Sequence, residues 1–434
     1  MGPSSHCKKP LCRVAHNLNI TPTLAQRLLL ILFPFAFGYY LSYLVRVVNA
    51  VLAPDLVRDL SLSPETLGLL TATYFITFAA TQIPLGILLD RYGPRKIEAG
   101  LLLFAALGSV IFAYGDSLGD LIIGRGLIGL GVSACLMAAF KSFTQWFKPQ
   151  RLPLINGLIM AAGGLGALTA TAPVQFALSY TDWRGVFLVL AVLILLCALM
   201  IYLLVPDHPE TGKGESLQTQ MKEMKSIFSD GFFWSIAPLT MLSQASFISI
   251  QSLWAGPWLR DIGGLSRADA ADTLLLIASS MIAGFLTLGT LAERLSHIGI
   301  KPVVVSGIGM LIFIMIQGAI ILEPAQSWVT PIWMAFGFFG TTGIVQYAVL
   351  SQHYPRNLSG RVNTAINLLV FITAFTLQWL IGKIIDLWPL VGADHYSPEG
   401  YQLAFGIVFA LQLTAFFWLI FAYKKHHRAI TEPV

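Results

Sequence analysis

Long apolar runs separated by short polar segments make up most of this sequence. Each run holds about 20 mostly uncharged residues, the length that an α-helix needs to cross a hydrocarbon core of about 30 Å. The pattern predicts an all-α membrane protein with twelve transmembrane helices, over residues 28–53, 65–89, 97–114, 120–140, 152–179, 183–205, 232–259, 270–292, 302–322, 329–350, 362–387 and 401–423.

The longest internal polar segment, residues 206–231, divides these runs into two groups of six. We therefore expect two six-helix bundles joined by a linker that holds at most one amphipathic turn. The predicted parts are an N-terminal tail (1–27), a first bundle (28–205), the linker (206–231), a second bundle (232–423) and a C-terminal tail (424–434).

A charged turn follows the second apolar run. Residues 86–96 read Gly-Ile-Leu-Leu-Asp-Arg-Tyr-Gly-Pro-Arg-Lys, and their charged members are Asp90, Arg91, Arg95 and Lys96. Gly86 and Gly93 permit close packing and a sharp bend. These features predict a short hinge at a membrane face.

A weaker copy of this turn closes the eighth apolar run, where Gly289 is followed by Glu293 and Arg294. Repetition of the motif predicts a duplicated unit. The alternative is two unrelated charge pairs, which are common at the ends of membrane helices. The first copy resembles the G-x-L-x-D-R-x-G-x-R-[RK] signature that joins the second and third helices of the major facilitator superfamily.

This resemblance implies a fold and a mechanism. Members of the superfamily have two six-helix halves related by pseudo-symmetry, and they act as secondary transporters by alternating access around a midplane site. The resemblance also implies gating roles for Gly86, Asp90, Arg91, Gly93, Arg95, Glu293 and Arg294. We find no nucleotide-binding motif, so we expect no ATP or other cofactor, and we expect a monomer that is not an enzyme.

Composition and charge agree with a lipid environment. The chain is 56% hydrophobic and only 11% charged, with a mean hydropathy of +0.72, whereas soluble domains are about 25% charged. The net charge of +5 comes from residues scattered through loops, which argues against nucleic-acid binding and for contact with an anionic membrane surface. The predicted location is a cell membrane, with a bacterial inner membrane favoured.

Basic residues lie mainly in one set of alternate loops. With the N-terminus inside, the outer loops receive only Arg58, Arg184, Arg260 and Arg267, while the inner segments carry most of the other Lys and Arg residues. This asymmetry predicts that both termini are cytoplasmic. The first apolar run is long enough to span, so we expect no cleavable signal peptide.

Cysteine and histidine contribute little to the prediction. Cys135 and Cys197 fall in apolar runs, and we expect no disulfide. Cys7 and Cys12 lie in the polar tail with two histidines, but a short tail rarely builds a closed tetrahedral zinc site, so we expect no metal. Every histidine lies in a loop or tail, and each Asp or Glu lies in a loop or near the end of a run. An intramembrane enzyme is therefore disfavoured, and no proton carrier is obvious.

Two arginines do lie within the apolar runs. Tyr39, Tyr43 and Arg46 share one face of the first predicted helix, next to Asn49, and Arg125 enters the fourth run in a glycine-rich segment. Both arginines lie roughly 10 Å below the outer ends of their helices. Either guanidinium can alternatively satisfy backbone carbonyls or extend to the interface, although a functional role is favoured for Arg46.

The resemblance implies a central cavity lined by the first, fourth, seventh and tenth helices. The candidate substrate-binding residues are then Tyr39, Tyr43, Arg46, Asn49, Arg125, Gln244, Gln251, Trp254, Gln346, Tyr347, Asn363 and Asn367. A cationic centre surrounded by tyrosine and amide groups suits a small anion such as a carboxylate. A coupling proton or a counter-anion is a further possible partner.

Two other functions compete with anion transport. Efflux of apolar or drug-like compounds is the runner-up, although residues 163–173 match the drug-antiporter motif only in part. A membrane receptor that keeps the fold without transport is the other. Organophosphate antiporters carry an arginine on the seventh helix, and this chain has none there before Arg260. Lys141 is interpreted as an inner-face anchor or as a second substrate contact.

The predicted topology can be tested with reporter fusions. Fusions after Lys96, Arg151 and Lys225 should report the cytoplasm, and fusions after Arg58 and Asp394 should report the outside, because the basic residues concentrate on one side. An external signal after Lys225 would contradict the arrangement of six plus six helices.

Overall fold

The computed structural model describes residues 23–148, 151–207, 217–391 and 395–431. The predictions made for residues 1–22, including Cys7 and Cys12, lie outside this range, and so does the middle of the linker. Within the described ranges, twelve helical segments are long and apolar enough to cross a membrane. The prediction of twelve spans is confirmed.

The first half contains ten of the labelled helices. They are α2 (Leu24–Arg27), α3 (Phe33–Val47), α4 (Asn49–Leu60), α5 (Pro64–Tyr92), α6 (Pro94–Tyr114), α7 (Leu118–Gly131), α8 (Cys135–Trp146), α9 (Leu152–Thr169), α10 (Ala172–Ala177) and α11 (Trp183–Leu204). A π-helical turn, Leu28–Leu32, joins α2 to α3.

The linker and the second half contain the remaining helices. They are α12 (Leu217–Phe228), α13 (Gly231–Ser249), α14 (Ala255–Asp261), α15 (Arg267–His297), α16 (Pro302–Ile321), α17 (Gln326–Phe339), α18 (Ile344–His353), α19 (Arg356–Ile385) and α20 (Pro398–Thr431). A π-helical turn, Ile250–Trp254, joins α13 to α14, and a 3₁₀ turn, Gly340–Gly343, joins α17 to α18.

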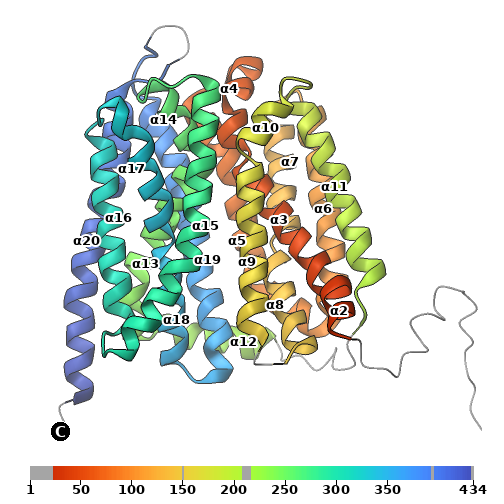
Figure 1. Cartoon of the computed structure of the whole chain (residues 1–434), viewed down its shortest axis with the longest axis vertical. Helices are drawn as coiled ribbons and strands as arrows, with labels where there is room; N and C mark the ends of the chain where they lie inside the picture. Colours follow the sequence, from red (N-terminus) through yellow and green to blue (C-terminus); the bar gives the residue numbers. More distant parts are fainter. Residues whose placement is uncertain (1–22, 149–150, 208–216, 392–394, 432–434) are drawn as a thin grey trace, which may run out of the picture.

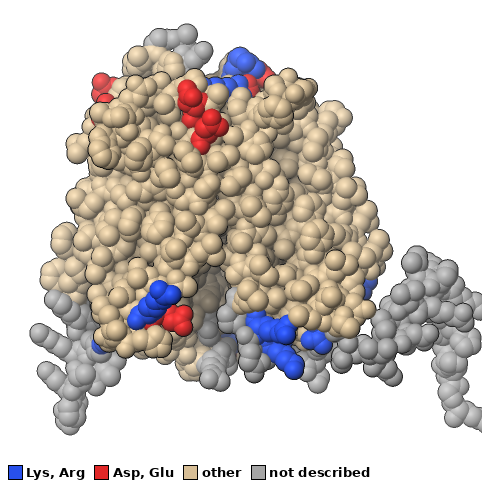
Figure 2. All heavy atoms as spheres, in the orientation of Figure 1, with Lys and Arg blue, Asp and Glu red and all other residues tan. Residues whose placement is uncertain are grey.

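The two halves stand side by side with their helices roughly parallel (Figure 1). On the face drawn in Figure 2, Lys, Arg, Asp and Glu side chains gather at the two ends and leave an uncharged band between them. This distribution is what a hydrocarbon environment requires. We call the end that carries Gly93 the Asp90 end, and the opposite end, which carries α4, the Asp55 end.

Spans in equivalent positions of the two halves are interrupted. The first and seventh spans each contain a π-helical turn. The fourth and tenth are broken in the middle, between α7 and α8 and at the 3₁₀ turn between α17 and α18. Non-α turns inside long helices mark strain or function, and here they occur in the four spans expected to line the centre and also in the fifth, between α9 and α10.

Glycines let the halves meet closely along α5 and α19. Trp254 packs between them, where a Cβ at Gly68 would lie 3.3 Å from its ring and one at Gly382 would lie 2.9 Å from it. The indole N–H donates to the Gln378 carbonyl at 3.1 Å. Trp254 is completely buried, so it forms part of the contact between the halves.

Two details differ from the sequence-based expectation. The first span ends at Val47 but the chain continues as α4 to Leu60, beyond the predicted end at residue 53. The linker forms the longer helix α12 instead of one turn, because Met224 and Ile227 pack into the hydrophobic core of the second half. Both differences arise from tertiary contacts that a hydropathy pattern does not contain.

The crossing of α6 and α7 provides a stability test. A Cβ at Gly108 would lie 2.6 Å from the Gly124 carbonyl oxygen, whereas a Cβ at Gly100 on the same helix would meet nothing within 4 Å. Gly108→Ala should therefore destabilise the protein by about 1–3 kcal/mol through overpacking. Gly100→Ala should be neutral or slightly stabilising, because alanine favours the helix.

Thermal unfolding of both variants in detergent checks this prediction. Equal unfolding temperatures for the two variants would contradict the close crossing of α6 and α7.

Candidate substrate-binding site

Arg46 is a buried cation near the end of α3, with 7% of its surface exposed. Its Nε donates to the Tyr74 hydroxyl at 3.4 Å. Within the described residues, neither terminal guanidinium nitrogen has a hydrogen-bond partner, and no carboxylate pairs with it. A charge buried without a counter-ion is costly unless a ligand or another group compensates it.

Aromatic rings surround this guanidinium. Its central carbon lies 4.5 Å from the Tyr43 ring centroid, 5.8 Å from Tyr74, 5.5 Å from Phe78 and 5.4 Å from Phe371. Cation–π contacts of this kind offset part of the desolvation cost. Phe371 comes from α19, so the second half contributes to the surroundings of a residue that belongs to the first.

Phe78 and Phe371 stack on each other across the two halves, with centroids 4.2 Å apart. One helical turn further along α5 and α19, Asn367 donates to Gln82 at 3.3 Å. Asn367 also accepts from the Tyr347 hydroxyl at 3.4 Å. From Arg46 towards the Asp90 end, the contacts are therefore an aromatic pair followed by an amide pair.

A cavity of about 380 Å³ lies beyond these contacts at the Asp90 end. Its lining runs from Gln82 to Asp90 on α5 and includes Lys141 on α8 and Arg361 on α19. Phe78 lies one turn of α5 before Gln82, on the side of Arg46. The stacked rings of Phe78 and Phe371 therefore separate this cavity from Arg46.

Arg125 has a different environment from Arg46. It donates to the carbonyl oxygens of Val45 at 2.7 Å and Arg46 at 3.3 Å, and its side chain is almost completely buried. The helix is interrupted at Val48, which leaves carbonyls at the end of α3 without helical donors. Arg125 supplies those donors and so holds the segment that carries Arg46.

Gln244 likewise donates to a backbone carbonyl at a helix break, in the second half. Its Nε2 donates to the Gly340 carbonyl at 3.0 Å, at the 3₁₀ turn of the tenth span. Gln251 contacts the Met281 sulfur at 3.4 Å. These side chains therefore contact helix breaks and neighbouring helices.

Some of the other candidate residues lie close to Arg46 or to the cavity, and others are buried between helices. Tyr39 packs edge-on against Tyr43, and Asn363 accepts from Ser351 at 2.7 Å on the cavity side of Asn367. Asn49 and Gln346 are buried, and both Asn49 amide atoms and the Gln346 carbonyl oxygen lack partners among the described residues.

The hinge segment has the expected conformation. Gly93 ends α5 with φ +84°, which strongly favours glycine, and Gly299 has φ +88° after the second copy of the motif. Asp90 pairs with Lys141 on α8, and Gly86 lines the same cavity. Lys141 therefore contacts the hinge.

The remaining hinge residues lie at the surface of the Asp90 end. Arg95 pairs with Asp207 at 3.1 Å and donates to the Tyr202 carbonyl at 2.9 Å. Arg91 lies over the Tyr92 ring, while Glu293 and Arg294 are exposed near the end of α15.

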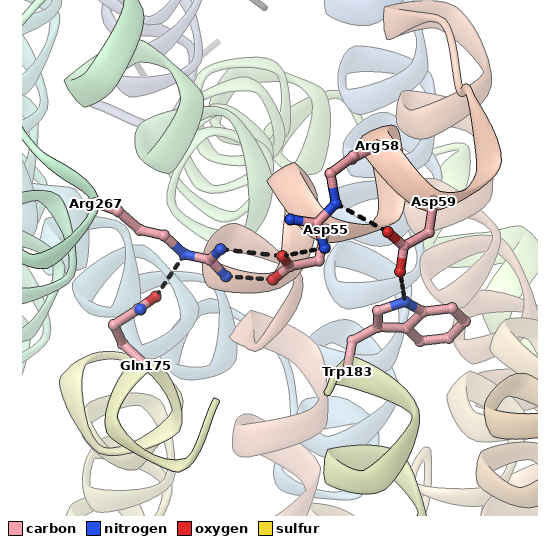
Figure 3. A network of polar contacts seen from close by, with 6 residues as sticks. All are labelled: Asp55, Arg58, Asp59, Gln175, Trp183 and Arg267. Atoms are coloured by element: carbon pink, nitrogen blue, oxygen red, sulfur yellow. Dashed lines mark hydrogen bonds and ion pairs between the residues drawn. The ribbon is translucent and has the colours of Figure 1, made fainter. Parts of the chain in front are cut away.

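At the Asp55 end, a polar network joins the two halves (Figure 3). Arg267 of α15 forms two bonds with the Asp55 carboxylate of α4 and a third with Gln175 of α10 at 2.9 Å. Bidentate pairing of this kind is strong and directional. It closes the end opposite the cavity.

Arg58 and Trp183 extend the same network. Asp59 accepts from the Trp183 indole at 3.0 Å and from Arg58 at 3.0 Å. Burial would raise the pKa of Asp59, but these hydrogen bonds outweigh burial and hold that pKa below its usual value.

Sequence reasoning did not find Tyr74, Phe78, Phe371 or the Asp55–Arg267 pair. The aromatic residues look like ordinary helix packing in a chain that is 12% aromatic, so only their contact with Arg46 distinguishes them. A usable signal existed for Arg267, because the outer segments hold only four basic residues, but acidic residues are numerous there and nothing in the sequence marks Asp55 as its partner.

Comparison with known proteins adds independent information. A family model described as Major Facilitator Superfamily matches residues 35–377. The hexuronate transporter of Escherichia coli K12 is 26% identical over 230 residues, which are 48% of this chain and 52% of that protein. The nitrite extrusion protein of Bacillus subtilis is 27% identical over 274 residues, which are 62% of this chain and 66% of that protein. These matches thus span roughly half to two thirds of each relative.

The fold also matches a solved structure. A bacterial homologue of the human lysosomal transporter Spinster, in an inward-facing and unoccupied conformation, has a TM-score of 0.77 and 18% sequence identity. The match covers 95% of this chain and all of that one. At this identity the likeness concerns the fold alone.

The closure at the Asp55 end can be tested by cysteine labelling. Ala271 is buried beside Arg267 and lines a small space between the halves. An Ala271→Cys thiol should react several times faster with a maleimide when Asp55→Asn is added, because loss of the ion pair shifts the population towards an open end.

Asp116→Asn is the matched control, since the Asp116–Arg184 pair lies within one half and Asp116 is exposed. Each protein is compared with a parent that lacks Ala271→Cys, which accounts for labelling of the native cysteines. Unchanged reactivity in Asp55→Asn would contradict the assigned closure.

Proposed function

Because this chain belongs to the Major Facilitator Superfamily, we propose that it is a secondary transporter that moves a small anion, most simply an organic carboxylate, by alternating access. The observation that carries the proposal is the buried guanidinium of Arg46, whose two terminal nitrogens have no partner in the described part of the chain. A carboxylate fits those two donors through parallel hydrogen bonds.

Binding would exchange one set of contacts for another. The faces of aromatic rings are electron-rich and attract the guanidinium, but they repel an anion. An anion reaching Arg46 must therefore displace Phe78 and Phe371, which are the rings that separate Arg46 from the cavity. The hydroxyls of Tyr43 and Tyr347 and the amides of Gln82 and Asn367 are then the polar groups on the path.

The basic residues of the loops indicate on which side of the membrane this path opens. If the Asp90 end is cytoplasmic, the cavity opens inward and the Asp55–Arg267 network closes the outer face. The structure then represents an inward-open state with its binding site closed by one aromatic pair. Rocking of the halves would break the Asp55–Arg267 pair and bring the Asp90 end together.

The relatives support an anionic substrate, since one is named for hexuronates and the other for nitrite. An organic acid and an inorganic anion need different hydrogen-bonding groups in a binding site. A hexuronate carries many hydroxyls that need donors and acceptors, and Gln82, Asn363 and Asn367 offer them beside the cavity. This polar lining favours the organic acid.

The proposal predicts a graded loss of affinity at Arg46. Arg46→Lys keeps the charge but loses the planar pair of donors, and Arg46→Gln loses both. Affinity for labelled glucuronate should fall from wild type to Arg46→Lys to Arg46→Gln. The full loss is about 10-fold or more, since a hydrogen bond to a charged group contributes about 1.5–3 kcal/mol.

The measurement is binding and counterflow in proteoliposomes, with nitrite as a second probe. Lys222→Gln, which removes an exposed charge from α12, is the control and should behave as wild type. Equal affinity across the three forms at position 46 would reject the anion site. It would favour efflux of apolar compounds through the same aromatic centre.

A further inference from the structure

Glu98 is a buried acid that the anion site does not use. It lies about one turn into α6, after Pro94, and none of its surface is exposed. Neither carboxyl oxygen has a nitrogen or oxygen hydrogen-bond partner among the described residues, and the Cys135 thiol is the weak donor beside it. Its position close to a helix end hides this burial from sequence inspection.

Among the residues that the structure describes, no charged group faces Glu98. The thiols of Cys135 on α8 and Cys197 on α11 lie beside it. On α3 the facing residue is Gly38, where a Cβ would lie 2.5 Å from Glu98 Oε1 and 3.6 Å from Cys197 Sγ. The two thiols are thus the titratable groups that face the carboxyl from the helices packed against it.

Burial without a counter-charge decides the protonation state. An ionised carboxylate enclosed in this way would be far more costly to bury than the neutral acid. Glu98 therefore carries a proton in the conformation described. A glutamine or an apolar residue could fill the same space, but neither can take up and release a proton as a glutamic acid can.

The helix that covers Glu98 also carries the anion site. Gly38 and Arg46 both belong to α3, roughly two turns apart. This segment is bounded by the π-helical turn Leu28–Leu32 and by the break at Val48, and such interruptions allow a helix to bend. A displacement of α3 would therefore uncover Glu98 and move Arg46 at the same time.

We propose that Glu98 is the proton-binding site that couples anion movement to proton movement, an inference that rests on the proposed function. The carboxylate takes up one proton and becomes the neutral acid when α3 packs against α6. When α3 moves away, the acid returns this proton to water as the carboxylate forms again. One proton moving with one monovalent anion makes the transport cycle electrically neutral.

The test uses the full-length protein in proteoliposomes, with labelled glucuronate and nitrite as probes. Counterflow measures anion exchange without net proton movement, and a trapped pH dye measures proton uptake on anion addition. Glu98→Gln mimics the protonated acid, so it should keep counterflow within a few-fold and lose anion-coupled proton uptake. Glu323→Gln, which changes an exposed carboxyl, should match wild type.

Two results would overturn the assignment of Glu98. They are wild-type proton uptake by Glu98→Gln, and counterflow without any coupled proton movement in the wild-type protein. No counterflow of either anion by the wild type would instead overturn the proposed function, and the coupling role with it.

A second measurement covers the case in which Glu98→Gln does not fold. The infrared carbonyl band of a buried protonated carboxyl, recorded on wild type, should shift or disappear when the transported anion is added. A band that is absent beforehand, or unchanged by the anion, would equally overturn the proposal.

Discussion

An unpaired guanidinium in an apolar interior is the constraint around which the centre of this protein is arranged. A buried guanidinium needs compensating contacts, and in the described part of the chain no carboxylate is near enough to neutralise Arg46. Rings from both halves cover it instead, at 4.5–5.8 Å from its central carbon. Because Phe371 comes from the second half, the stabilisation of the buried charge depends on how the halves are packed.

The helices around Arg46 are interrupted, and in both halves a side chain donates hydrogen bonds to the backbone carbonyls at the break. Arg125 donates to carbonyls at the break after α3, and Gln244 donates to the carbonyl of Gly340 at the break in the tenth span. Non-helical backbone at membrane depth persists only where such partners satisfy it. Arg125 and Gln244, which the sequence suggested as substrate contacts, thus hold the backbone at two helix breaks.

The twelve spans and the hinge at Gly93 followed directly from hydropathy and motif, because lipid imposes a strict rule on length and charge. Arg46 also stood out, since a charge within an apolar run is rare. The role of Phe78 could not be read from the sequence, because an aromatic residue in a membrane helix is ordinary until its neighbours are known. Glu98 was set aside because distance from a helix end is a poor measure of burial in a packed bundle.

The Asp55–Arg267 pair links the resting shape of the molecule to its surroundings. About a third of the Arg267 side chain and a tenth of that of Asp55 are exposed, so dissolved ions can compete with the pair and screen it within about 8–10 Å at ordinary salt. The apolar contacts between α5 and α19 have no such sensitivity. Rising ionic strength should therefore weaken one end of the interface between the halves and leave its centre intact, so that the salt concentration on that side of the membrane affects how firmly the two halves hold together there.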